Sequence, residues 1–208
     1  MSRDTGPQCK RCRREGMQLF LKGSRCYTVK CGLNKRNYPP GEHAWRRGKF
    51  SEYGHQLREK QKVKRYYGVT ERQFRKYFDK ASRMKGNTGE NLIVLLESRL
   101  DNVVYRLGMA RSHSEARQMI AHGNIRVNGK RLDIPSALLR RNDTVSPVER
   151  EKFRKIIKEN LESATDISLP SWLQFDAEKM EGVVLETPKR TEIPIQVQEQ
   201  LVVEFCSK

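Results

Sequence analysis

The strongest hydrophobic pattern in the chain begins near residue 91. Over residues 91–107, apolar side chains recur at the three- and four-residue spacing of an amphipathic helix: Leu92, Leu95, Leu96, Leu100, Val103, Val104 and Leu107. Gly108 follows where helices commonly end, because glycine adopts a left-handed conformation at low cost. The pattern therefore predicts one long helix that stops at Gly108.

A second, shorter helix is predicted directly afterwards. Ser112 and Glu115 form the S-x-x-E pattern of a capping box, and Gly123 provides the C-terminal stop. One face of this helix is apolar and consists of Ala116, Met119 and Ile120.

Residues 125–132 predict a β-hairpin. Asn128 and Gly129 lie between alternating residues, and Asn-Gly is the strongest short-range hairpin signal because both turn positions need a positive φ. Period-two alternation directs Ile125 and Leu132 to one face, which we expect to be the core.

The opposite face of this predicted hairpin carries Arg126 and Arg131, directly across from one another. Two like charges at opposed strand positions are unfavourable unless an anion lies between or above them. Lys130 adds a third positive charge beside the turn. This arrangement indicates a polyanionic ligand.

The remaining periodic segments predict an α+β protein. Residues 51–67 predict a basic helix, and Thr70 and Gln73 predict a capping box for a following helix. The core-facing residues of that helix are Phe74, Tyr77, Phe78 and Ala81. After the hairpin we expect a short strand at 144–148, a helix from Pro147 to about Glu162, an irregular stretch at 163–198, and a strand or buried run at 197–205.

The distribution of charge along the chain indicates which classes of partner the protein binds. The 208-residue chain has a formal net charge of +17. Residues 1–50 carry 13 Lys and Arg against 3 Asp and Glu, whereas residues 151–208 carry 8 against 11. A basic chain with a mildly acidic end predicts nucleic acid as one partner and protein as another. No apolar run is long enough to span a bilayer and the N-terminus lacks a signal-peptide core, so we expect a cytoplasmic location and no membrane.

Four cysteines near the N-terminus form two close pairs, Cys9 with Cys12 and Cys26 with Cys31. Two such pairs can converge as thiolates on one tetrahedral Zn²⁺, and residues 1–45 contain too few apolar residues for a core of their own. Two disulfides and four unconnected thiols are the alternatives, but a cytosolic compartment disfavours the former. The spacing predicts one structural zinc ion, which would stabilise this segment.

Other basic residues interleave with aromatics or cluster on helices, which suits phosphates and unstacked bases. The RNA contacts predicted within residues 43–65 are His43, Trp45, Arg46, Arg47, Lys49, Arg58, Lys62 and Arg65. Those predicted within residues 106–131 are Arg106, Arg111, His113, Arg117, Arg126, Lys130 and Arg131, where we expect an exposed cluster of charge.

Several stretches carry a resemblance to a known family. Residues 99–136, RLDNVVYRLGMARSHSEARQMIAHGNIRVNGKRLDIPS, resemble the small RNA-binding module of the ribosomal protein S-four family. CKRCRREG at 9–16, YPPGEH at 38–43, QLREKQKVKRYYGVTERQF at 56–74 and EQLVVEF at 199–205 extend the resemblance, in order, over nearly the whole chain.

The resemblance implies a domain organisation: a zinc-binding segment at 1–45, a helical domain at 46–97 completed by the tail 196–208, the RNA-binding module at 98–162, and an irregular extension at 163–195. It also implies binding to a multi-helix junction of small-subunit ribosomal RNA (rRNA), nucleation of subunit assembly and a contribution to translational accuracy. The implied protein neighbours are ribosomal protein S-five and also S-three, with messenger RNA as a further ligand and no small-molecule substrate. Some members of this family lack the cysteines.

Two other functions fit parts of the sequence. The same module is carried by RNA-modifying enzymes such as pseudouridine synthases, but we find no nucleophile, base and orienting group that could form a catalytic site. A zinc-ribbon transcription factor would prefer duplex DNA over folded RNA. The absence of a phosphate-binding glycine loop or acidic cluster favours a non-enzymatic protein.

Overall fold

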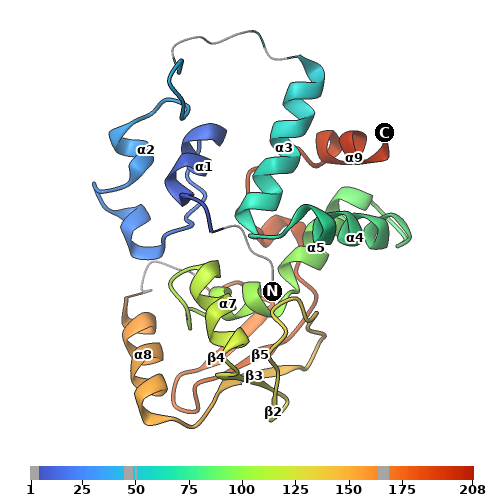
Figure 1. Cartoon of the computed structure of the whole chain (residues 1–208). Helices are drawn as coiled ribbons and strands as arrows, with labels where there is room; N and C mark the ends of the chain where they lie inside the picture. The colour runs from blue at the N-terminus through green and yellow to red at the C-terminus, as the bar shows by residue number, and fades with distance from the viewer. Residues whose placement is uncertain (1–4, 45–48, 50, 164–168) are drawn as a thin grey trace. The chain divides into compact units, whose positions relative to one another are not determined.

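The computed structural model of the protein describes residues 5–44, 49, 51–163 and 169–208 (Figure 1). The chain forms two compact units: unit 1 comprises Met1–Leu92 and Ile195–Lys208, and unit 2 comprises Ile93–Pro194. Helices occur in both units, and every strand of the described residues lies in unit 2. The predicted mixture of helices and a small sheet is therefore confirmed.

Unit 1 is helical. In chain order it contains α1 (Gln8–Glu15), the 3-10 helix η1 (Gly23–Tyr27), α2 (Gly32–Lys35), α3 (Glu52–Tyr66), α4 (Glu71–Ser82), the start of α5 (Thr88–Glu97) and α9 (Glu199–Ser207). The apolar side of α4 is buried as predicted, and Val63 of α3 is also fully enclosed.

The C-terminal residues, predicted as a strand or a buried run, form a helix with one buried side chain. In Figure 1, α9 (red) lies beside α3, and the two helices are in contact. Gln56 Nε2 donates to Glu204 Oε2 at 3.0 Å, and Lys60 Nζ lies 4.8 Å from the ring centroid of Phe205. A short apolar run fits either a strand or a helix face, and here Val202 is buried on the α9 face.

Unit 2 combines helices with one sheet. Its elements are the end of α5, α6 (Leu100–Arg106), α7 (His113–Ala121), β1 (Ile125–Val127), β2 (Lys130–Arg131), β3 (Thr144–Pro147), α8 (Glu151–Glu162), β4 (Leu173–Asp176), β5 (Glu181–Val184) and the 3-10 helix η2 (Arg190–Glu192). The sheet is antiparallel with the strand order β2-β1-β3-β5-β4. Its core includes Ile120 of α7, Ile125 of β1, Val145 of β3 and Ile157 of α8, all fully buried.

The predicted single helix over 91–107 is wrong, because the structure contains two helices, α5 and α6. Arg99 separates them with an extended backbone, φ −71° and ψ 142°. Here the chain pairs with residues 137–139: Leu100 N–H donates to Ala137 O, and Leu139 N–H donates to Ser98 O, both at 2.8 Å. A distant segment thus supplies hydrogen bonds that compete with the helix, which hydrophobic spacing alone cannot reveal.

The predicted irregular stretch after α8 is also wrong, because it contains β4 and β5. β5 pairs with β3, which aligns Val145 with Gly182. A Cβ at Gly182 would clash with Leu107, so glycine allows the strand to pass close to the end of α6. These strands are four residues each, so their local sequence signal is weak. β4 pairs with the nearby β5, and β5 also pairs with the distant β3.

The predicted helix boundaries are only partly correct. Ser112 Oγ accepts the Glu115 N–H at 3.3 Å, as the capping pattern predicts. Thr70 precedes α4 but its side chain makes no capping hydrogen bond. Pro147 does not begin a helix: it ends β3, opposite Ile125, and α8 starts at Glu151.

Candidate nucleic-acid interface

The β1–β2 hairpin forms with the predicted turn and register. Asn128 and Gly129 have φ values of 50° and 77°, as an Asn-Gly turn requires. Arg126 lies opposite Arg131, and Val127 lies opposite Lys130. The arginine pair and the buried Ile125 thus occupy the faces expected from alternation.

The hairpin tip is held by the loop before β3. The Asn128 side chain donates to Asp143 Oδ1 and accepts the Thr144 N–H, both at 2.8 Å. Asp143 Oδ2 also accepts the Arg140 N–H at 2.6 Å, and Arg140 and Arg141 are both exposed. Our sequence reasoning missed these two arginines; their adjacency directly before the Asn142-Asp143 turn was the available signal.

Few of the described residues neutralise the hairpin charges. Arg126 Nη1 lies 4.0 Å from Glu149 Oε1, in a pair whose side chains are 39% and 75% exposed, and an ion pair of this kind contributes little. Lys130 and Arg131 are exposed. Gly123 follows α7 and has a φ of 70°. A Cβ at this position would clash with the Arg131 guanidinium, so the glycine also leaves room for that side chain.

Three other residues that we expected in an exposed cluster are buried: Arg106, His113 and Arg117 are each 8% exposed. Arg106 Nη2 lies 2.5 Å from Glu97 Oε1, and Glu97 is itself 1% exposed. The expectation of exposure is therefore wrong for these three side chains. Arg106 compensates the buried Glu97 carboxylate. The hydrophobic pattern could not predict this pair, because Glu97 and Arg106 lie on two different helices separated by the unpredicted break at Arg99.

His113 belongs to the same buried network. Its Nε2 lies 2.9 Å from Asn102 Oδ1, while Asn102 Nδ2 donates to the Glu97 backbone O at 3.0 Å. Since Asn102 Oδ1 is thereby the acceptor, His113 Nε2 carries the proton. Burial, with smaller contributions from Arg106 and Arg99, lowers the pKa of His113 to about 3. The imidazole is neutral at neutral pH and adds no charge to an RNA surface.

A second buried group contains Arg99 and Asp101. Arg99 Nε and Nη2 donate to the two Asp101 oxygens at 2.9 and 2.6 Å, and Arg117 Nη1 lies 3.6 Å from Asp101 Oδ2. Asp101 thus pairs with arginine, as expected for a lone carboxylate among apolar residues. Arg111 differs, because it is exposed and donates to Asn160 Oδ1 at 2.6 Å.

The basic residues predicted as an RNA surface on α3 form ion pairs within unit 1. Arg58 and Arg65 both bind Glu15 of α1, the former at 3.3 Å. Burial raises the pKa of Glu15, and the two guanidinium groups oppose that effect. Lys62 Nζ lies 2.5 Å from Glu59 Oε1. These three cations are only 15–26% exposed.

The residues predicted around the Tyr38–Pro40 turn are only partly described. His43 and Lys49 are exposed. Trp45, Arg46 and Arg47 lie outside the described residues. Arg13 donates to the Tyr38 backbone O at 2.9 Å and lies over the Tyr38 ring at 4.6 Å, which fixes the start of this segment to α1.

The four N-terminal cysteines are brought together. All five cysteines of the chain are free thiols, and one small hollow of unit 1 is lined by Cys9, Cys12, Cys26 and Cys31. Lys22 N–H donates to Cys26 Sγ at 3.4 Å, and Gln18 Nε2 to Cys31 Sγ at 3.7 Å. As placed, however, no group of three or more His, Cys, Asp or Glu side chains within the described residues is positioned to hold a metal ion.

A basic chain with an arginine-bearing hairpin at the edge of a small sheet falls in the class of nucleic-acid-binding proteins. Comparisons with known proteins agree. A sequence profile described as "Ribosomal protein S4/S9 N-terminal domain" matches residues 3–97, and one described as "S4 domain" matches residues 98–145.

Full-length relatives extend this match. The chain is 56% identical to small ribosomal subunit protein uS4 of Thermodesulfovibrio yellowstonii, and 55% identical to that of Trichlorobacter lovleyi. The uS4 protein of Thermoanaerobacter sp. strain X514 is 52% identical, and each alignment covers 100% of both chains. The chain belongs to the family of small ribosomal subunit protein uS4. It is a structural, rRNA-binding component of the small ribosomal subunit and not an enzyme. Among the described helices, none is long and apolar enough to cross a membrane.

Proposed function

We propose that the chain binds a multi-helix junction of small-subunit rRNA through the hairpin surface, defined as Arg111, Arg126, Lys130, Arg131, Arg140 and Arg141. The single observation that carries this proposal is the direct opposition of the half-buried Arg126 and the exposed Arg131 on neighbouring strands. Such a pair is unfavourable alone and becomes favourable when phosphate lies against it. Arg106, His113 and Arg117 are buried, so their proposed role is to stabilise the packing of the helices that support this surface.

The wider role follows from the family resemblance. Binding a junction of several RNA helices would hold them in their folded arrangement, which is how an early-binding protein nucleates assembly. Messenger RNA is proposed as a further ligand, and S-five and S-three are the proposed protein neighbours. A contribution to translational accuracy would act through those protein contacts.

Chemical footprinting on purified small-subunit rRNA tests the junction. We expect protection at a junction of helices, and loss of part of that protection in an Arg126→Ala/Arg131→Ala variant. Protection confined to a single uninterrupted duplex, or unchanged protection in the variant, would contradict the proposal.

We also propose that Cys9, Cys12, Cys26 and Cys31 hold one structural Zn²⁺. Four free thiols around one hollow are the donor set of a structural zinc site. The N–H groups that donate to Cys26 and Cys31 suit thiolates, because hydrogen bonds from the surrounding shell orient metal ligands and tune the site. Bound zinc would supply stability to a segment with few apolar residues.

Elemental analysis under reducing conditions tests the metal. We expect about one zinc per chain, lost on Cys12→Ser, with proteolytic sensitivity increasing in residues 5–44 and not in unit 2. The matched control is Cys206→Ser, which should keep its zinc. A zinc content near zero in the reduced wild-type protein would refute this assignment.

A further inference from the structure

The tip of the β1–β2 hairpin carries a chemically reactive pair of residues. Asn128 is followed by Gly129, which is the one Asn-Gly pair in the chain. The backbone nitrogen that follows an asparagine can attack the side-chain carboxamide carbon, and glycine hinders this attack least because it has no Cβ. Both residues are exposed, and no described heavy atom beyond the chain neighbours lies within 4 Å of a Cβ placed on Gly129. The turn is therefore open to this reaction and to water.

Hydrogen bonds polarise the Asn128 carboxamide. Its Oδ1 accepts the Thr144 N–H at 2.8 Å and the Thr144 hydroxyl at 3.3 Å. Two donors on one carbonyl oxygen stabilise the negative charge that develops on that oxygen during nucleophilic attack on the carbon. The fold thus adds an activating contact to a pair that is already reactive by sequence.

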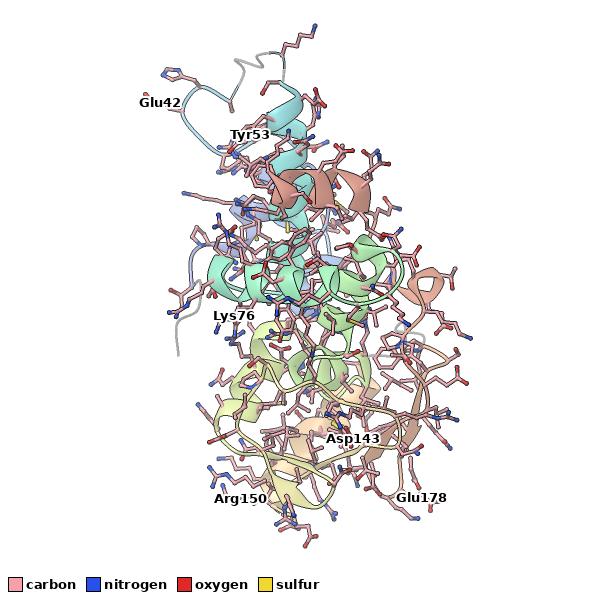
Figure 2. All side chains as sticks on the ribbon, turned by 90° about the vertical axis from the view of Figure 1, so that its right-hand side faces the viewer. Glu42, Tyr53, Lys76, Asp143, Arg150 and Glu178 are labelled. Carbon is pink, nitrogen blue, oxygen red and sulfur yellow. The ribbon has the colours of Figure 1, made fainter. Side chains whose placement is uncertain are left out.

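The nitrogen of the same carboxamide binds a carboxylate. Asn128 Nδ2 donates to Asp143 Oδ1 at 2.8 Å, and Figure 2 labels Asp143 in the loop before β3. We name the hydrogen bonds that join the Asn128 side chain to Asp143 and Thr144 the tip clasp. A carboxylate in place of the carboxamide would have no proton to donate, and its negative charge would lie at hydrogen-bond distance from Asp143. Like charges this close repel one another.

We propose that Asn128 is a site of spontaneous deamidation and that the reaction opens the tip clasp. The Gly129 nitrogen bonds to Asn128 Cγ and loses its proton to water. The Cγ–Nδ2 bond breaks, and Nδ2 takes a proton from water and leaves as ammonia. One water molecule then opens the resulting succinimide ring to give aspartate or isoaspartate, and the ammonia takes up the proton of the new acid. Water is the only co-reactant.

Both products change the hairpin tip. Each adds one negative charge beside Lys130 and separates the tip from the loop that carries Arg140 and Arg141. Isoaspartate also inserts one carbon atom into the main chain of a two-residue turn, whose length determines the strand register. The modification takes place on the protein alone and does not depend on RNA binding.

The reaction is tested by incubating the full-length, RNA-free protein in mildly alkaline buffer. Peptide mass spectrometry measures the conversion of amide to acid, and labelling by an isoaspartate methyltransferase identifies the isoaspartate product. We expect Asn128 to convert several times faster than Asn142, which is also exposed and has a positive φ of 66° but precedes an aspartate. An intact amide at Asn128, or equal conversion at both positions, would overturn the proposal.

The opening of the tip clasp is tested with Asn128→Asp, which reproduces one product. Hydrogen exchange of the backbone amides at positions 128 and 144 should become roughly tenfold faster, because the bond to Asp143 is replaced by repulsion. The matched control is Asn128→Asp/Asp143→Asn, which exchanges the amide and the carboxylate and keeps the net charge. This double variant should restore wild-type exchange rates. Unchanged exchange in the single variant, or no recovery in the double variant, would contradict the opening of the clasp.

Discussion

Two groups of arginines in unit 2 differ in what surrounds them. Arg99, Arg106 and Arg117 are 0–8% exposed and lie beside Asp101 or Glu97. Arg126 and Arg131 face each other across a hairpin, and the carboxylate that pairs with Arg126 is the exposed Glu149. The same residue type therefore stabilises the protein in one place and offers charge to RNA in the other. A buried carboxylate within reach makes the difference.

The largest effect should come from breaking a buried pair. Glu97→Ala leaves the Arg106 guanidinium buried without its carboxylate, and it removes the Glu97 Oε2 atom that accepts a hydrogen bond from Asn102 Nδ2. Removing one partner of a buried pair costs about 3–5 kcal/mol of unfolding free energy. Glu149→Ala is the matched control at the exposed pair and should cost less than about 1 kcal/mol. Denaturant unfolding of both variants measures the comparison, and similar losses would show that burial does not separate the two groups.

The next effect concerns the inner face of the hairpin. Ile125 is fully buried in the core of unit 2, directly beside Arg126 in sequence. Ile125→Ala should lower the unfolding free energy by about 2–5 kcal/mol through lost burial and the cavity that remains. RNA binding should recover at temperatures where the variant is folded. A stable Ile125→Ala variant with lost RNA binding would reverse the assignment of the two faces.

A smaller, pH-dependent effect is expected from His113. Its pKa is lowered to about 3 in the folded chain, against about 6.5 when unfolded. The unfolded state therefore binds a proton first as the pH falls, and the stability provided by neutral His113 is lost from about pH 6.5 downward, by at most about 1.4 kcal/mol per pH unit.

His113→Gln should remove this part of the pH dependence, while the exposed His122→Gln serves as the control and should leave it unchanged. Denaturant midpoints between pH 7 and pH 4 provide the measurement. Parallel pH profiles for wild type and His113→Gln would contradict a neutral, buried imidazole.

The smallest change in stability should come from the two hairpin arginines. Arg126→Ala and Arg131→Ala should each stay within about 0.5 kcal/mol of wild type. Each should nevertheless weaken RNA binding and lower the salt slope by about one unit, because one phosphate contact is lost. Wild-type affinity and slope in both variants would show that the hairpin does not face phosphate.

Local patterns were sufficient for elements that depend on near neighbours. The hairpin register follows from Asn128-Gly129, because two positive φ values define the turn and alternation then orders the flanking residues. The Ser112 cap likewise needs only a residue three positions away. The resemblance to the S-four family, confirmed by full-length relatives, rested on residues in the same order along the chain.

Tertiary structure alone decided the features that depend on distant partners. The break at Arg99 arises because residues 137–139 compete for its backbone, and β5 is a strand because β3 lies beside it. The roles of the cations were decided in the same way: Glu97 removes Arg106 from the surface, and Glu15 occupies Arg58 and Arg65. The sequence determines how much charge the chain carries, but the free energy of each charge depends on burial and on the nearest opposite charge, and folding sets both.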